Sequence, residues 1–136
     1  MIKMVVGLQG SGKTKTLIDE VNRASASSAG AVVCVEYGRK LSYNIGYDVR
    51  LVDAKDYGIK DACAFYGFVC GLLASNHDVT DLFIDSALKI CGDDISAFAD
   101  FLNKLDELTS REGVHCFLTA SVKAEDLPDS VSKYIA

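Results

Sequence analysis

The sequence predicts an α/β protein with three layers, in which a mostly parallel β-sheet lies between layers of helices. Two observations predict this class. Short apolar, β-branched segments alternate along the chain with longer segments that have helical periodicity. The apolar segments are nearly continuous, which is typical of parallel strands covered on both faces. We therefore expect successive strands to be joined by right-handed crossovers.

The composition is that of one small globular domain. At 136 residues the chain can bury one core, so a single domain spanning residues 1–136 is expected. The formal net charge of -5 argues against nucleic acid as a partner. The five cysteines are odd in number and form no C-x-x-C pair, which indicates a reduced protein of the cytoplasm. The longest near-apolar stretch, 62–74, is too short to span a membrane.

A glycine-rich loop, residues 7–14, separates the first expected strand, Ile2–Val6, from the first helix. It reads Gly-Leu-Gln-Gly-Ser-Gly-Lys-Thr, which fits the phosphate-binding pattern G-x-x-x-x-G-K-[ST] at every specified position. Glycines let backbone N–H groups turn toward an anion, and the positive end of the following helix adds to the attraction. The alternative is an ordinary glycine-rich turn before a lysine-bearing helix. The residues expected to bind the nucleotide are Gly7, Gln9, Gly10, Ser11, Gly12, Lys13, Thr14 and Lys15.

The elements that follow are predicted from apolar spacing. Apolar residues recur at helical spacing over 17–21, after the glycine-rich loop. A second buried strand, 31–35, ends at Glu36. Beyond it, segments 41–43 and 47–52 are expected either to pair as a small hairpin or to supply an edge strand.

Residues 62–74 predict a helix that is apolar on nearly all sides. Such a helix is either buried or in need of a partner. Both interpretations stay open: the helix packs inside the domain, or it forms a face for a homodimer or for another protein. A domain of this size has few places to bury a helix completely.

A third strand, 81–85, ends in an acidic residue, Asp85. The carboxyl ends of parallel strands share one edge of a sheet, so Asp85 is expected to emerge beside the glycine-rich loop. Magnesium prefers oxygen ligands and keeps several waters, so Thr14 and Asp85 together with phosphate oxygens would form a magnesium site. Asp48 and Asp53 are the competing carboxylates, and chance placement of an acid after a strand is the alternative.

The clearest amphipathic helix follows this third strand. Its apolar residues recur at i, i+3, i+4 and i+7 spacing. Asp93 or Asp94 is the expected N-cap, and Gly113 is the expected end of the helix.

The end of the chain predicts one more strand and a short helix. The strand, 114–120, turns polar at Thr119, and Ser121 follows it. These two hydroxyls either face a γ-phosphate or simply end the strand, and the second interpretation is favoured. Pro128 introduces a short helix that reaches Tyr134 and is expected to close the sheet.

With the loop at 7–14 and the strand ending in Asp85, the chain resembles a P-loop NTPase of the RecA-like group. Its order of elements is most similar to the nucleotide-binding domain of the zinc-containing thymidine kinases, and it also resembles small ATP-binding proteins of clostridial-type bacteria. The resemblance implies ATP or another nucleoside triphosphate as ligand, Mg as cofactor and a catalytic role for Lys13. The sequence departs from those kinases at Ser86, where they have a catalytic glutamate, and it has no cysteine-rich zinc lasso.

Hydrolysis also needs a group that orients water. In RecA-like ATPases this group is a glutamate at the end of the strand adjacent to the P-loop strand, and Glu36 is the candidate that the resemblance implies. If the strand order places Glu36 too far from the loop, it is only an acid at the end of a strand. Arg39 or Lys40 is a candidate to supply positive charge to a γ-phosphate, in the same chain or across a dimer; the alternative, which is favoured, is that both are solvated residues after a strand.

Three functions are therefore expected in order of preference. The first is an ATP-binding protein with slow or partner-stimulated, magnesium-dependent hydrolysis. The second is a nucleotide kinase related to thymidine kinase that lacks its lid. The third is a non-catalytic nucleotide-sensing module that docks through residues 62–74.

Overall fold

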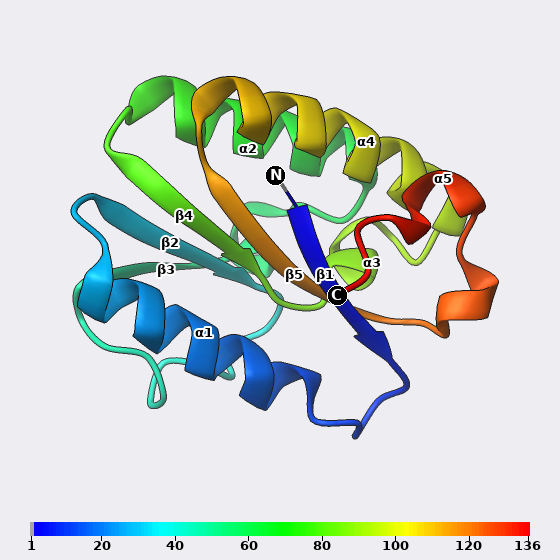
Figure 1. Cartoon of the computed structure of the whole chain (residues 1–136), viewed down its shortest axis with the longest axis horizontal. Coiled ribbons are helices and arrows are strands. Elements are labelled where there is room, and N and C mark those ends of the chain that lie inside the picture. Colours follow the sequence, from blue (N-terminus) through cyan, green and yellow to red (C-terminus); the bar gives the residue numbers. More distant parts are fainter. Residues whose placement is uncertain (1) are drawn as a thin grey trace.

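The computed structural model describes residues 2–136, so the first residue of the predicted domain 1–136 lies outside the described residues. Within residues 2–136, five parallel strands form one sheet in the order β1-β5-β4-β2-β3. Helix α1 lies against one face of this sheet, and α2 and α4 lie against the other (Figure 1). The predicted α/β class is confirmed, and the sheet is parallel throughout.

The strands and long helices lie close to the expected segments, although the third strand ends at Ile84, one residue before Asp85, and three of the short helices were not predicted. In chain order they are β1 (Ile2–Gly7), α1 (Lys13–Ser27), β2 (Ala31–Glu36), β3 (Val49–Asp53), the short 3-10 helix η1 (Ala54–Tyr57), α2 (Ala62–Ser75), β4 (Val79–Ile84), α3 (Ala87–Ile90), α4 (Ile95–Glu112), β5 (His115–Ser121), the 3-10 helix η2 (Ala124–Asp126) and α5 (Asp129–Ser132).

The segment 41–52 forms an edge strand and no hairpin. Strand β3 pairs in parallel with β2 at the edge of the sheet, whereas 41–43 lies in a turn. The physical reason is that Leu41 is used elsewhere. Its side chain is buried against α1, and its backbone N–H donates to the carboxylate of Glu36. The predicted edge strand is thus confirmed, and the predicted hairpin is wrong.

Two apolar cores lie on the two faces of the sheet. The larger one packs the sheet against α2 and α4, where the rings of Phe65 and Phe101 stack with their centroids 4.9 Å apart. The smaller one packs α1 on the opposite face through Leu17 and Val21. Because helices cover both faces, the central strands are apolar along most of their length.

Helix α2 is buried on one side only. Phe65, Val69 and Leu73 face the core, whereas the small residues Gly67 and Gly71 are exposed. The interpretation as a packed helix is therefore confirmed for this face. A homodimer through the outer face stays a prediction. Among residues 2–136, no helix is both long and apolar enough to cross a bilayer.

The last residues of the chain pack beside β1. Helix α5 begins after Pro128, as expected, and it leads to Tyr134, whose hydroxyl donates to Asn103 on α4 at 2.8 Å. The N–H of Met4 donates to the carbonyl of Tyr134 at 2.7 Å, and the N–H of Ala136 donates to the carbonyl of Met4 at 2.8 Å. The outer edge of β1 is thereby covered.

Candidate functional site

The glycine-rich loop connects the carboxyl end of β1 to the first turn of α1. Gly10 and Gly12 have φ angles of 85° and 88°, in the left-handed region that side-chain-bearing residues seldom adopt. Gly12 is also the N-cap residue of α1, where no side chain caps the helix. The first amide groups of α1 and the positive end of its dipole are therefore available to an anion.

Lys13 is directed back into this loop. Its side chain is buried, and its ammonium group donates to the carbonyl of Leu8 at 3.0 Å and to the hydroxyl of Ser11 at 3.4 Å. The contact places a positive charge inside the curve of the loop. A lysine held in this way attracts a negatively charged ligand to the same place.

The structure brings together the two predicted magnesium ligands. The hydroxyl of Thr14 lies 3.4 Å and 3.3 Å from the two carboxylate oxygens of Asp85, although the residues are 71 positions apart in the sequence. Asp85 is only 1% exposed. The two competing acids make other contacts, since Asp48 accepts from Ser25 and Asp53 accepts from the N–H groups of Gly38 and Lys55.

Asp85 is held in place by strands on both sides of its own. From β5, Thr119 donates a hydrogen bond of 2.6 Å to Asp85, and from β2 the carbonyl of Val35 accepts its N–H at 2.8 Å. Thr119 in turn accepts the N–H of Ser86 at 2.9 Å. Strand β5 ends at Ser121, so the expectation that the two hydroxyls end the strand is confirmed for Ser121, whereas Thr119 lies within the strand and contacts Asp85. The pairing of β4 with β5 explains the contact. Leu118 pairs with Ile84, so Thr119 and Asp85, which come one residue later, lie beside each other.

A cavity of about 370 Å³ opens beside these residues. Within the described chain its charged lining consists of four lysines and two aspartates, so the cavity has a positive balance in a protein with a net charge of -5. Such a cavity favours an anionic ligand. The lining residues are Gln9, Gly10, Gly12, Lys13, Thr14, Lys15, Lys40, Asp85, Ser86, Leu88, Lys89, Asp93, Thr119 and Ser121.

Three charged residues of the lining go beyond the predicted site. The sequence predicts a phosphate contact for Lys40 only as an alternative to Arg39, and it predicts no contact with a ligand for Lys89 or Asp93. Lys40 follows β2, and Lys89 and Asp93 follow β4. The ammonium of Lys89 lies 5.3 Å from the ring centroid of Tyr37. Asp93 has a φ of 58° and precedes the N-cap residue of α4, which is Asp94. Their shared signal is their position after strands that end at the same edge as β1.

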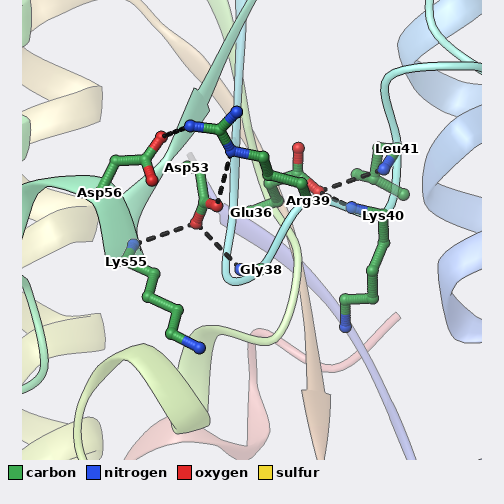
Figure 2. A network of polar contacts seen from close by, with 8 residues as sticks. All are labelled: Glu36, Gly38, Arg39, Lys40, Leu41, Asp53, Lys55 and Asp56. Carbon is green, nitrogen blue, oxygen red and sulfur yellow. Dashed lines mark hydrogen bonds and ion pairs between the residues drawn. The ribbon is translucent and has the colours of Figure 1, made fainter.

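Glu36 is not among the cavity-lining residues that the structure describes. Strands β5 and β4 lie between β1 and the strand that Glu36 ends. Glu36 is 2% exposed, and its Oε1 accepts the N–H groups of Lys40 at 2.8 Å and of Leu41 at 3.1 Å (Figure 2). The structure thus gives Glu36 a role in holding a turn, and its catalytic role stays a prediction.

Three cysteines, Cys34, Cys91 and Cys116, are buried as structural residues are, whereas Cys70 is partly buried and Cys63 is exposed. Burial raises the pKa of the Cys34 thiol far above its usual range, and the negative charges of Asp85 and Glu36 raise it further. A protonated, buried thiol is a poor nucleophile and metal ligand. In the part of the chain that the structure describes, no three His, Cys, Asp or Glu side chains form a group that would hold a metal ion by themselves.

In comparisons with known proteins, the chain matches no protein-family model and no curated protein.

Proposed function

We propose that this chain binds a nucleoside triphosphate together with magnesium, in the manner of a RecA-like P-loop NTPase. One observation carries the proposal. Thr14 and Asp85, which come from different elements, meet beside a glycine-rich loop whose geometry and charge suit a phosphate chain. A glycine-rich turn alone gives no reason for a buried carboxylate to lie next to the first turn of α1.

Each part of the site has a distinct task in this proposal. The backbone N–H groups of the loop and the first turn of α1 bind the phosphate oxygens. The ammonium of Lys13 leaves Leu8 and Ser11 and neutralises the β- and γ-phosphates. Magnesium would be held by the oxygens of Thr14 and Asp85 and would neutralise phosphate charge, and it would take its other ligands from phosphate and water. Thr119 keeps the carboxylate of Asp85 in position.

We propose slow or partner-stimulated hydrolysis as the activity of this site. Phosphoryl transfer depends mainly on positioning and charge neutralisation, which Lys13 and the magnesium ligands would supply. Of the two carboxylates that line the cavity in residues 2–136, Asp85 is committed to the metal, which leaves Asp93 to orient water.

A non-catalytic nucleotide-sensing module is the second candidate. Two observations favour it: Ser86 follows Asp85 directly, and Oε1 of Glu36 is already bonded to backbone N–H groups. Measurement of phosphate release separates the two candidates, because a sensor binds the nucleotide and does not turn it over.

Calorimetric titration with ATP and GTP, each in magnesium and in EDTA, tests the binding proposal. We expect the wild type to bind one of them more tightly with magnesium. Lys13→Ala should lower the affinity roughly tenfold or more, because it removes a charge-assisted contact with phosphate. Asp85→Asn should abolish the magnesium enhancement. Lys104→Ala on α4 is a control of equal charge outside the cavity. A wild type that binds neither nucleotide would overturn the proposal.

A further inference from the structure

The turn that follows β2 is fixed at several points around Lys40. Gly38 has a φ of 86°, and its N–H donates to Asp53 at 2.9 Å. The N–H groups of Lys40 and Leu41 both donate to the buried carboxylate of Glu36. The side chain of Leu41 is 1% exposed and packs in the core beneath α1. The backbone of Lys40 is therefore held on both sides, and only its side chain is free to adjust.

The two basic residues of this turn have different surroundings. Arg39 reaches toward η1, where its guanidinium donates to Asp56 at 2.7 Å and lies 4.0 Å from a carboxylate oxygen of Asp53 (Figure 2). Lys40 extends away from these acids in the same view and lines the cavity. Its ammonium has no ion-pair partner among residues 2–136, which leaves it available for an anionic ligand.

The other three lysines of the cavity already have contacts. Lys13 bonds within the glycine-rich loop, and Lys15 pairs with Asp19 one turn along α1 at 3.3 Å. Lys89 lies over the ring of Tyr37. Lys40 is thus the lysine of the cavity whose charge is least satisfied within the described chain.

The order of the strands places Lys40 at the far side of the cavity from the glycine-rich loop. Along the carboxyl edge of the sheet, the loop follows β1, Thr119 lies on β5, Asp85 follows β4 and Lys40 follows β2. Asp85, the proposed magnesium ligand, therefore lies between the loop and Lys40. In the proposed binding mode the phosphate chain runs from the loop past Asp85, so its terminal phosphate faces Lys40.

We propose that Lys40 binds the terminal phosphate and makes the site prefer a nucleoside triphosphate to a diphosphate, with Glu36 as the positioning residue that holds Lys40. This inference rests on the proposed function. It assigns the charge at the terminal phosphate to Lys40 and not to Arg39. It also explains why a carboxylate is buried at the end of β2, since its two hydrogen bonds fix the backbone that presents the lysine.

The test compares the dissociation constants of the triphosphate and the diphosphate in magnesium, with the base that the wild type binds more tightly. For Lys40→Ala we expect the triphosphate to bind roughly tenfold more weakly, because a charge-assisted contact is lost. The diphosphate should change by less than about twofold, as for the loss of a screened surface charge. Lys40→Arg should restore most of the preference.

Two control variants and one positioning variant complete the test. Arg39→Ala, in the same turn, and Lys55→Ala, an exposed lysine on η1, should both leave the ratio of the two constants unchanged. Glu36→Ala should lower the preference for the triphosphate as Lys40→Ala does. Thermal unfolding checks that this variant is folded. The double variant Glu36→Ala/Lys40→Ala should lose no more of the preference than Lys40→Ala alone. Equal effects of Lys40→Ala on both nucleotides, or no effect, would overturn the inference. A wild type that binds neither nucleotide overturns the proposed function instead.

Discussion

Thr119 donates a hydrogen bond of 2.6 Å to Asp85 across the boundary between β5 and β4. Both side chains are 1% exposed, so water does not compete effectively for this contact. The hydroxyl of Thr119 also accepts the N–H of Ser86, which fixes the direction in which its single proton points. One buried hydroxyl therefore orients the carboxylate and ties the end of β4 to β5.

Replacement of Thr119 by the isosteric Val should weaken both stability and metal-dependent binding. The variant leaves Asp85 and the N–H of Ser86 without this partner, at a cost of about 1–3 kcal/mol in the free energy of unfolding. The magnesium enhancement of nucleotide affinity should fall as well, since the carboxylate is no longer oriented. Chemical denaturation and calorimetry measure the two effects. Thr109→Val, a buried hydroxyl on α4 outside the cavity, should affect stability alone. An unchanged magnesium effect in Thr119→Val would contradict this role.

Phosphate release should depend more on Asp93 than on Glu36. Asp93 is exposed and lines the cavity, so its carboxylate is free to orient water, whereas Oε1 of Glu36 is bonded to the turn. We expect Asp93→Asn to lower the steady-state rate of phosphate release from ATP more than Glu36→Gln does, with ATP affinity measured for each variant. The reverse order would support the catalytic role that the sequence predicts for Glu36.

Two glycine substitutions should change stability in opposite directions. A Cβ atom at Gly30 would lie 2.3 Å from the backbone oxygen of Asp78 and 2.5 Å from a methyl group of Thr80, at the start of the pairing between β2 and β4. Gly30→Ala should therefore cost about 1–3 kcal/mol. Gly71 lies on the exposed side of α2 with open space around it, so Gly71→Ala should gain roughly 0.5–1 kcal/mol in helix stability. Thermal and denaturant unfolding measure both, and a neutral Gly30→Ala would show that this junction moves freely.

Alkaline pH should destabilise the protein through its buried thiols. Burial raises the pKa of Cys91 and Cys116 to about 12, so the folded state retains protons that the unfolded chain releases near pH 9. Their contribution to stability is complete below the pKa of the unfolded chain, and it is lost as pH rises through the range up to about 12. The free energy of unfolding should fall less steeply above pH 9 in the Cys91→Ala/Cys116→Ala variant. Parallel curves for wild type and variant would rule out this cause.

The sequence predicted the strands and helices well because most of them are either continuously apolar or strongly periodic. Strand β2 and helix α4 have such patterns, and so their bounds agree with the structure. The structure of the segment 41–43 was harder to predict, because its apolar residue Leu41 belongs to a turn and packs beneath α1. Local alternation does not distinguish a buried turn from a short strand.

The candidate site was predictable only in part. The contact between Thr14 and Asp85 follows from one rule, that parallel strands end at a common edge. The contacts of Thr119 and Glu36 depend on which strands are neighbours and in what register, and no local pattern contains this information. Spacing did not distinguish Lys40 from Arg39 either. The two residues differ because Asp53, at the end of β3, and Asp56, on η1, lie beside Arg39.

The position of β1 in the sheet has a consequence for biosynthesis. Within the described chain, β1 pairs with β5 at residues 116–121, and its other edge is bonded to residues 134–136. Among the described strands, β1 is synthesised first and its partner β5 last. A nascent chain that ends before residue 116 contains the whole glycine-rich loop and all of β2, β3 and β4. In such a chain β1 has no strand to pair with, and only the packing of α1 on the sheet holds the loop near Asp85. The arrangement in which β1 is paired and Thr119 lies beside Asp85 therefore forms only after β5 has been synthesised.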